Sequence, residues 1–353
     1  MKKAKTLSAL LFLITLLMSG CFLQPKKAEK PVTKIGFIGP LTGDGASWGA
    51  DSKNGLALAA SELGDIQVIY EDAACSGQQA ATAAQKLINI DHVQFIIGGI
   101  CSGETLAAAP IAEAARAVLV SPASESPDIS QAGDYIFRTW PSADSGIRLV
   151  GQEIKDKFQR VALISEQDEF GMGNRKILLD IWEEEDVIDE TYLPGNKDFR
   201  TALAKIRTFA PQAIFMNHHT DETALAILQQ IKEAGLDLPI YTNTNGSSEG
   251  LAKEANNLAQ GLTFPELPTD LTGDFQQKFT SKFGQPQAML RVAATTYDTV
   301  YLLHKLISEY GYDATQVKDA LYQTEYSGVV GKYQFDKNGD LVGAGYRLRK
   351  YPQ

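Results

Sequence analysis

Residues 34–70 read KIGFIGPLTGDGASWGADSKNGLALAASELGDIQVIY, and this stretch decides the fold. Its apolar start at 34–39 predicts a strand, the Ala, Leu and Gly pattern of 48–63 predicts a helix, and 66–70 predicts a second strand. Apolar strands of ~4–6 residues that alternate with helices of ~10–15 residues are typical of a parallel sheet with helices on both faces. The stretch therefore predicts the first strand–helix–strand unit of an α/β fold.

The alternation runs on to residue 120 and, after an extended stretch (RTWP, 138–141), starts again and continues to residue 241. Two such runs predict two doubly wound lobes, and 353 residues suit two domains of ~100–200 residues each. Further helices are expected toward the C-terminus, followed by a tight hairpin turn at 336–340 (DKNGD). The predicted fold class is α/β, with two doubly wound parallel-sheet lobes.

Composition and charge exclude several classes of protein. The chain is 44% hydrophobic and 22% charged, which is ordinary for a globular protein. Lys and Arg number 33 against 43 Asp and Glu, giving a net charge of −10 with no basic block. Because phosphate neutralisation requires clustered Lys and Arg, no nucleic-acid partner is expected.

The N-terminus predicts export. A basic start (KKAK, 2–5) precedes an apolar run at 7–18, which is shorter than the ~20 residues that span a bilayer and is typical of a secretory signal. The run ends in LMSGC, which resembles a bacterial lipobox and predicts a lipidated Cys21; a plain signal peptide that happens to contain a Cys is the alternative. We therefore expect an extracytoplasmic, lipid-anchored chain with a signal peptide at 1–21 and a polar tether at 22–32.

Two further cysteines, Cys75 and Cys101, remain after Cys21. Exported proteins occupy an oxidising compartment, where two leftover thiols tend to pair. Each of these cysteines follows a predicted strand of the first lobe, so both should lie at neighbouring carboxyl ends and within reach of each other. A disulfide is expected, with two free buried thiols as the alternative.

The motifs of phosphate-binding loops, calcium loops and Cys- or His-rich metal sites are missing from the sequence. His218 and His219 form the only His pair, and adjacent His residues rarely chelate one metal ion without a carboxylate partner. The glycine-rich loop at 39–49 lacks the Gly-Lys-Ser/Thr of a phosphate-binding loop. The turn at 336–340 lacks the later Gly and Glu of a calcium loop. We expect no enzyme, no metal and no cofactor.

A binding site is expected where the two lobes face each other. Ligands of doubly wound sheets bind outside the carboxyl ends of the strands, and here the loops at those ends carry small hydroxyl residues, amides and aromatics. Ser102 precedes a predicted helix as an N-cap that could offer donors to a carboxylate, or could only cap its helix. Trp48 could form an apolar wall of the site, or belong to the core of its lobe.

The sequence resembles the Leu/Ile/Val-binding proteins, which are type I periplasmic substrate-binding proteins of ABC importers. The resemblance covers residues 33–353 and rests on an ordered series of motifs. These motifs are IGFIGPLTG (35–43), WG (48–49), NG (54–55), EDxxC (71–75), IGGxCS (97–102), SPA (121–123), FRT (137–139), FGxG (170–173), YD (297–298) and FDxxGD (335–340).

The resemblance implies two α/β lobes joined by three crossings at a hinge, and a Cys75–Cys101 disulfide. The implied lobes are 33–142 plus 266–338, and 143–265 plus 339–353. It also implies a monomer that catalyses nothing, closes around an amino-acid-like small molecule and presents its closed form to a membrane ABC permease. A ligand-sensing lipoprotein that signals to a membrane partner is the alternative, because nothing in one chain excludes it.

Ligand-binding positions follow from the resemblance one by one. Trp48 matches an aromatic that contacts the ligand side chain, and Ser102 and Ala123 match positions that bind the α-carboxylate and α-amino groups. Glu125 stands where the family has Thr, His219 near a family Tyr, and Thr244 near the acid that pairs with the ligand ammonium. The full predicted set is Trp48, Ser102, Ala123, Ser124, Glu125, Phe170, His219 and Thr244.

Glu125 and Thr244 suggest that the acidic partner of the ligand has changed sides. A carboxylate is missing at Thr244 and present instead at Glu125, and a desolvated ammonium needs a counter-charge. We therefore predict that Glu125 recognises a positively charged group of an amino acid or a related small amine or amide. The alternative is that Glu125 points to solvent and caps the turn before Pro127.

Overall fold

The computed structural model describes residues 32–268 and 271–351. The predicted signal peptide, Cys21 and all but the last residue of the predicted tether lie outside the described residues. Within the described ranges, no helix is both long enough and apolar enough to cross a membrane.

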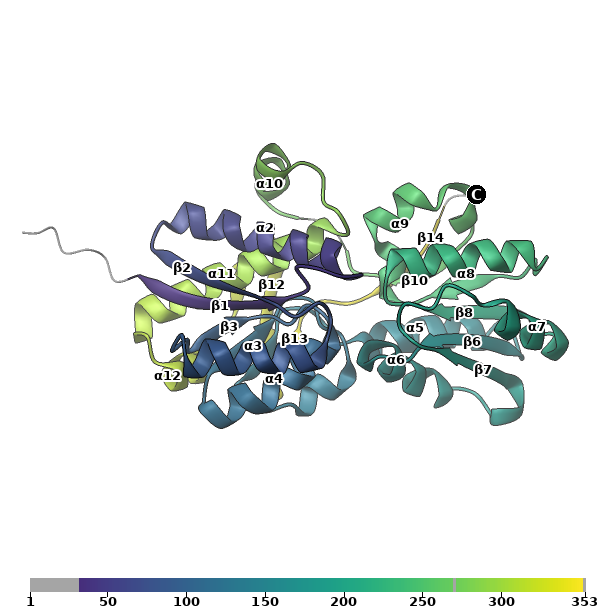
Figure 1. Cartoon of the computed structure of the whole chain (residues 1–353), viewed down its shortest axis with the longest axis horizontal. Helices are drawn as coiled ribbons and strands as arrows, with labels where there is room; N and C mark the ends of the chain where they lie inside the picture. Colours follow the sequence, from purple (N-terminus) through teal and green to yellow (C-terminus); the bar gives the residue numbers. More distant parts are fainter. Residues whose placement is uncertain (1–31, 269–270, 352–353) are drawn as a thin grey trace, which may run out of the picture. The chain divides into compact units, whose positions relative to one another are not determined.

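The first lobe is built on a five-stranded parallel sheet with strand order β2-β1-β3-β4-β5. Figure 1 labels β1, β2 and β3 of this sheet. Along β1, Ile35 and Phe37 pack into a cluster with the helices α2 and α11, whereas Ile38 packs on the other face with α3 and α4. A strand covered by helices on both faces must be apolar on both faces, which is why the predicted run at 34–39 shows no polar alternation. The elements are β1 (Thr33–Gly39), α2 (Ala46–Leu63), β2 (Ile66–Asp72), α3 (Gly77–Asn89), β3 (Phe95–Ile97), α4 (Ser102–Ala115), β4 (Val118–Ser121), the 3₁₀ helix η1 (Pro127–Gln131) and β5 (Ile136–Arg138).

C-terminal elements complete the first lobe. Helix α11 packs on α2 so closely that a Cβ at Gly55 would lie 2.1 Å from the carbonyl oxygen of Ala293, which explains a glycine in mid-helix. The predicted hairpin is present as β12–β13, and Gly339 has a φ of 74° in its turn. These elements are α10 (Phe275–Phe283), α11 (Leu290–Tyr310), α12 (Ala314–Leu321), β11 (Tyr326–Gly328), β12 (Gly331–Phe335) and β13 (Leu341–Val342).

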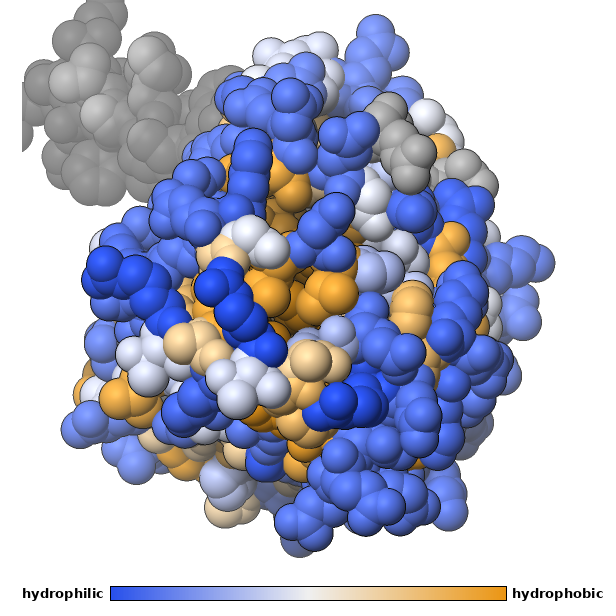
Figure 2. Space-filling model, turned by 90° about the vertical axis from the view of Figure 1, so that its right-hand side faces the viewer, coloured by the Kyte–Doolittle hydropathy of each residue, from blue (hydrophilic) through white to orange (hydrophobic). Residues whose placement is uncertain are grey.

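The second lobe holds a six-stranded sheet with order β14-β10-β9-β8-β6-β7, parallel except for the antiparallel edge pair β10–β14. At its α7–α8 end the surface is largely hydrophilic around an apolar hollow (Figure 2). Its elements are α5 (Ala143–Lys155), β6 (Val161–Glu166), α6 (Glu169–Leu179), η2 (Glu184–Asp186), β7 (Val187–Tyr192), α7 (Arg200–Phe209), β8 (Ala213–Asn217), α8 (Asp221–Glu233), β9 (Ile240–Thr242), η3 (Thr244–Ser247), α9 (Glu249–Glu254), η4 (Asn256–Ala259), β10 (Thr263–Glu266) and β14 (Arg347–Lys350).

The chain crosses between the lobes three times: between β5 and α5, after β10, and between β13 and β14. This arrangement confirms the predicted fold of two doubly wound lobes. The strand β13 pairs with β12 of the first lobe, so the third crossing follows Val342. The predicted boundary before residue 339 is therefore too early, because backbone pairing keeps the second arm of the hairpin with the first lobe.

Candidate functional site

The predicted disulfide between Cys75 and Cys101 is present at the carboxyl edge of the first sheet. The buried carboxylate of Glu104 fixes the backbone around it. It accepts hydrogen bonds from the N–H groups of Cys75 (2.9 Å), Ile100 (2.9 Å) and Cys101 (3.1 Å). Burial raises the pKa of Glu104 to about 7, against these hydrogen bonds. The covalent bond and the carboxylate together hold two loops of the first lobe in place.

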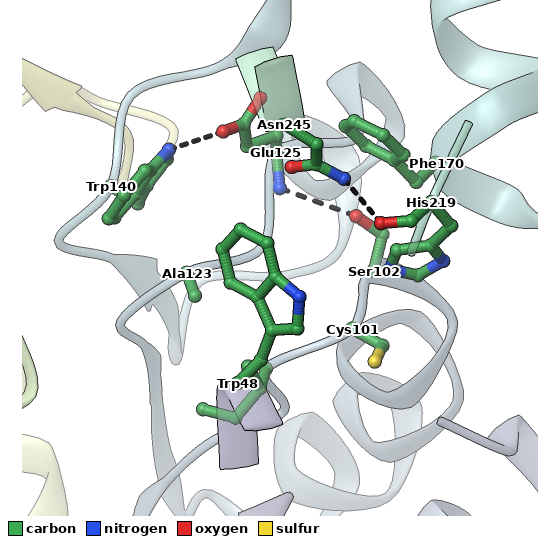
Figure 3. A pocket seen from close by; sticks show the side chains of 10 residues that line it. Trp48, Cys101, Ser102, Ala123, Glu125, Trp140, Phe170, His219 and Asn245 are labelled. Atoms are coloured by element: carbon green, nitrogen blue, oxygen red, sulfur yellow. Dashed lines mark hydrogen bonds between the residues drawn. The ribbon is translucent and has the colours of Figure 1, made fainter. Parts of the chain in front are cut away.

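A pocket lies where loops at the carboxyl ends of the two sheets meet (Figure 3). The space left between the side chains is about 30 Å³, room for one or two water molecules. An organic ligand can therefore enter only when the lobes or the lining side chains move. The lining residues are Trp48, Ile100, Cys101, Ser102, Ala123, Glu125, Trp140, Phe170, His219 and Asn245.

Most of the predicted ligand-binding residues meet in this pocket: Trp48, Ser102, Ala123, Glu125, Phe170 and His219 all line it. Thr244 and Ser124 are not among its lining residues, and the ligand-binding role of Ser124 stays a prediction. The hydroxyl of Ser124 donates to the carbonyl oxygen of Gly99 (3.0 Å) and lies 2.7 Å from the hydroxyl of Thr105, inside the lobe. Successive residues of this loop point to opposite sides, so that Ala123 faces the pocket and Ser124 faces the core.

Ser102 plays a different structural part from the predicted one. Helix α4 begins at Ser102 itself, and Cys101 is the N-cap residue. The hydroxyl of Ser102 accepts hydrogen bonds from the backbone N–H groups of Glu125 (3.3 Å) and Ser126 (3.1 Å), the first of which is drawn in Figure 3. Ser102 therefore fixes the loop that carries Glu125.

Glu125 bridges the lobes. Its Oε1 accepts a hydrogen bond from the indole N–H of Trp140 (2.6 Å), and its Oε2 accepts one from the hydroxyl of Thr244 in the second lobe (2.6 Å). The residue is 5% exposed, so the solvent-facing alternative is wrong. Burial raises the pKa of Glu125 to about 7, although both hydrogen bonds and the charges of Arg138 and His219 favour the ionised form.

The pocket face of the second lobe is organised around His219. Its Nδ1 is hydrogen-bonded to the carboxylate of Asp168, and its backbone N–H donates to Glu166 (3.1 Å). Burial alone would lower the pKa of His219, but the neighbouring carboxylates, Asp168 first, raise it to about 9. The imidazole is therefore a cation at neutral pH.

The two adjacent histidines have separate surroundings. Nδ1 of His218 lies 3.0 Å from the hydroxyl of Thr242, and burial lowers the pKa of His218 to about 3. A ring nitrogen of His219 and the sulfurs of Cys75 and Cys101 lie within 4.8 Å of one another. Because these sulfurs are bonded to each other, they are not thiolates that could ligate a metal ion.

Hydrogen bonds among asparagine side chains support the loop that carries His219 on the second lobe. The side-chain oxygen of Asn217 accepts hydrogen bonds from Asn174 (3.2 Å) and Asn243 (3.0 Å), and its NH₂ donates to the carbonyl of Gly171 (2.7 Å). Asn245 donates to the carbonyl of His219 (2.8 Å), as Figure 3 shows. This network sets the loop that presents His219.

The predicted ligand-binding set lacks four of the lining residues: Ile100, Cys101, Trp140 and Asn245. The available signals were weak: Asn245 stands in a loop after a predicted strand, and Trp140 stands in the extended stretch between the two runs of strands and helices. The residues next to Trp140 in the sequence do not indicate that the first crossing passes beside the pocket.

A family model for periplasmic binding proteins matches residues 32–351, and the chain belongs to this family. Curated relatives confirm the resemblance to Leu/Ile/Val-binding proteins. A "Leucine-, isoleucine-, valine-, threonine-, and alanine-binding protein" of Pseudomonas aeruginosa is 26% identical and covers 87% of each chain. A Leu/Ile/Val-binding protein of Escherichia coli is 22% identical over 88% of each.

Solved structures share the fold. A leucine binding protein from Thermotoga maritima superposes with a TM-score of 0.81 at 24% identity, covering 91% of this chain and 96% of that one. A solute binding protein of an ABC transporter from Rhodopseudomonas palustris, in complex with 3,4-dihydroxy benzoic acid, gives 0.79 at 22% identity over 90% and 93%. One fold thus serves ligands of different chemistry, so the pocket residues must decide the ligand.

Proposed function

We propose that this chain is the lipid-anchored, extracytoplasmic substrate-binding protein of an ABC importer. In this proposal it binds an amino acid, or a related small amine or amide, between its lobes and delivers it to a membrane permease without catalysing a reaction. Membership of the periplasmic binding protein family supports the class, and the LMSGC motif at 17–21 supports the anchor.

The observation that carries the ligand class is the buried carboxylate of Glu125 at the lining of the pocket. Among the described residues its side chain accepts hydrogen bonds only from neutral groups, Trp140 and Thr244, and a carboxylate has ~four lone-pair positions. A further donor can therefore still bind, and an ammonium group would supply both the donor and the missing positive charge.

The rest of the lining suits a zwitterion with an apolar side chain. His219 offers a positive charge on the face opposite Glu125, where a ligand carboxylate could bind, and Ala123 lines the pocket on the side of Glu125. Trp48 and Phe170 would form the apolar walls against the ligand side chain. A ligand with a carboxylate but no amine leaves Glu125 unpaired and should bind poorly.

Two experiments test this function. Mass spectrometry of small molecules released on denaturing the purified protein identifies a carried ligand. Calorimetry with leucine, leucinamide and 4-methylpentanoate compares the wild type, Glu125→Gln and the surface control Glu153→Gln on α5. We expect Glu125→Gln to lose at least about ten-fold in affinity for the amine-bearing probes, about 1.4 kcal/mol, and the control to lose nothing. Equal affinities of Glu125→Gln and wild type across the panel would refute the assignment.

A further inference from the structure

Trp140 connects the carboxylate of Glu125 to the hinge. It stands in the first crossing between β5 and α5, is 4% exposed, and donates its indole N–H to Oε1 of Glu125 at 2.6 Å. Hydrogen bonds to an ionised carboxylate are stronger than those between neutral groups, so this contact orients the carboxylate as well as stabilising it.

Residues from the other two crossings hold the ring of Trp140. Leu267 follows β10 in the second crossing, and Tyr346 belongs to the third; both pack in one apolar cluster with Trp140. The guanidinium of Arg291 lies 5.8 Å from the ring centroid and donates to the carbonyl of Pro268 (2.5 Å), again in the second crossing. The indole therefore has little freedom to move unless the crossings themselves move.

We propose that Trp140 is a positioning residue, which holds the carboxylate of Glu125 toward the cleft and ties that position to the hinge. When the lobes separate, Thr244 leaves with the second lobe, whereas Trp140 stays beside Glu125 on the first crossing. Trp140 is then the donor that keeps the carboxylate oriented when a ligand first arrives. That last step rests on the proposed function; the control of Glu125 by Trp140 does not.

Several charged or titratable groups face Glu125 and enter any measurement of its titration. Arg138 on β5 and His219 of the second lobe favour the ionised form of Glu125. The phenol of Tyr346 is buried and interacts with both Glu125 and Arg138. Removal of the Trp140 N–H takes away a donor to the ionised form, so it should raise the pKa of Glu125 further. This direction distinguishes a positioning role from simple packing, which a phenylalanine ring would preserve.

The first test needs no ligand. The protein contains three Trp residues, and ¹⁵N labelling of their indoles gives three N–H signals, of which the Trp140 signal is the one lost in Trp140→Phe. We expect this signal to shift between pH 5 and 9 in the wild type as Glu125 titrates, and to lose that shift in Glu125→Gln. Trp182, whose indole nitrogen has no hydrogen-bond partner among the described residues, is the internal reference. A Trp140 signal that behaves alike in both proteins overturns the proposal.

The second test measures recognition with leucine and leucinamide as probes. Trp140→Phe should weaken binding three-fold or more. It should also raise the pH below which binding is lost, because Glu125 is then protonated at a higher pH. The matched control Trp182→Phe should change neither the affinity nor this pH. Unchanged affinity and pH profile in Trp140→Phe refute the positioning role in recognition. If the wild type binds neither probe while the Trp140 signal still follows Glu125, the proposed function fails and the control of Glu125 by Trp140 stands.

Discussion

The two faces of the pocket are held in place by different forces. On the first lobe, a disulfide and the buried carboxylate of Glu104 fix the loops around Cys101. On the second lobe, the loop of His219 is held without a covalent bond, by the hydrogen bonds of Asn217 and its neighbours and by the ion pair with Asp168. A covalent bond tolerates the loss of a neighbour, whereas each member of a buried hydrogen-bond network depends on the others. We therefore expect the second face to be the more easily disturbed.

The two faces also differ in how their charges are matched. His219 is surrounded by the carboxylates of Asp168 and Glu166, so its positive charge is balanced within its own lobe. Glu125 is hydrogen-bonded by the neutral side chains of Trp140 and Thr244. Glu125 thus has no counter-charge among its hydrogen-bond partners, whereas His219 has one, so a ligand ammonium should gain more at the first face than a ligand carboxylate gains at the second.

Removing the covalent bond should have the largest effect on stability. The disulfide joins cysteines 26 residues apart, and closing such a loop is worth roughly 3–4 kcal/mol on the chain-entropy model. We expect a Cys75→Ser/Cys101→Ser double variant to lose that much free energy of unfolding in a urea titration. The reduced wild type should behave like the variant. A loss below about 1 kcal/mol would mean that Glu104 and packing hold the first face without the bond.

Breaking the amide network should cost slightly less. Asn217 is fully buried, and its side chain makes four hydrogen bonds, to Asn174, Asn243, Gly171 and Ser165. Its replacement by Ala leaves buried donors and acceptors unpaired, each a loss of about 1–3 kcal/mol that relaxation partly recovers. We expect Asn217→Ala to lower the free energy of unfolding by about 2–3 kcal/mol, with the exposed control Asn257→Ala near wild type. If Asn217→Ala leaves the free energy of unfolding nearly unchanged, the second face does not depend on this hydrogen-bond network.

The fold could be predicted from the sequence because its signals are local. The run at 34–70 already contains the strand, helix and strand of the first unit, and each later unit repeats that pattern. The site was only partly predictable. Trp48 and Glu125 could be placed because family motifs fix them in the segments that follow β1 and β4, Trp48 in the first turn of α2 and Glu125 in a loop, but motif position does not tell which way neighbouring side chains point. The hydroxyl of Ser124, for example, points into the lobe.

The places of Trp140 and Asn245 in the pocket could not be predicted from the sequence. Trp140 reaches the pocket because the first crossing passes beside it, and Asn245 does so because η3 packs against the loop of His219; tertiary packing settles both, rather than the residues beside them in the sequence. The interlobe contact between Glu125 and Thr244 is of the same kind, since 119 positions separate the two residues. The sequence could show that both depart from a family pattern, but only the structure shows that they meet.

The smallest expected effect concerns pH and the second face. The pKa of His219 is raised from 6.5 to about 9 in the folded chain, although burial opposes this, because Asp168 and Glu166 stabilise the cation. A group with a raised folded-state pKa contributes stability that is fully present below its unfolded value and is lost as pH rises through the folded value. Glu104 and Glu125, whose pKa values are raised to about 7, affect stability mainly below pH 7.

Urea unfolding should therefore show a loss of free energy of unfolding on the order of 1–2 kcal/mol between pH 7 and 9.5. His219→Gln should flatten that slope, while the buried neutral neighbour varied as His218→Gln should keep it. If the free energy of unfolding falls with pH equally in His219→Gln and wild type, the positive charge of the second face does not lie at His219. The two faces would then not differ in how their charges are matched.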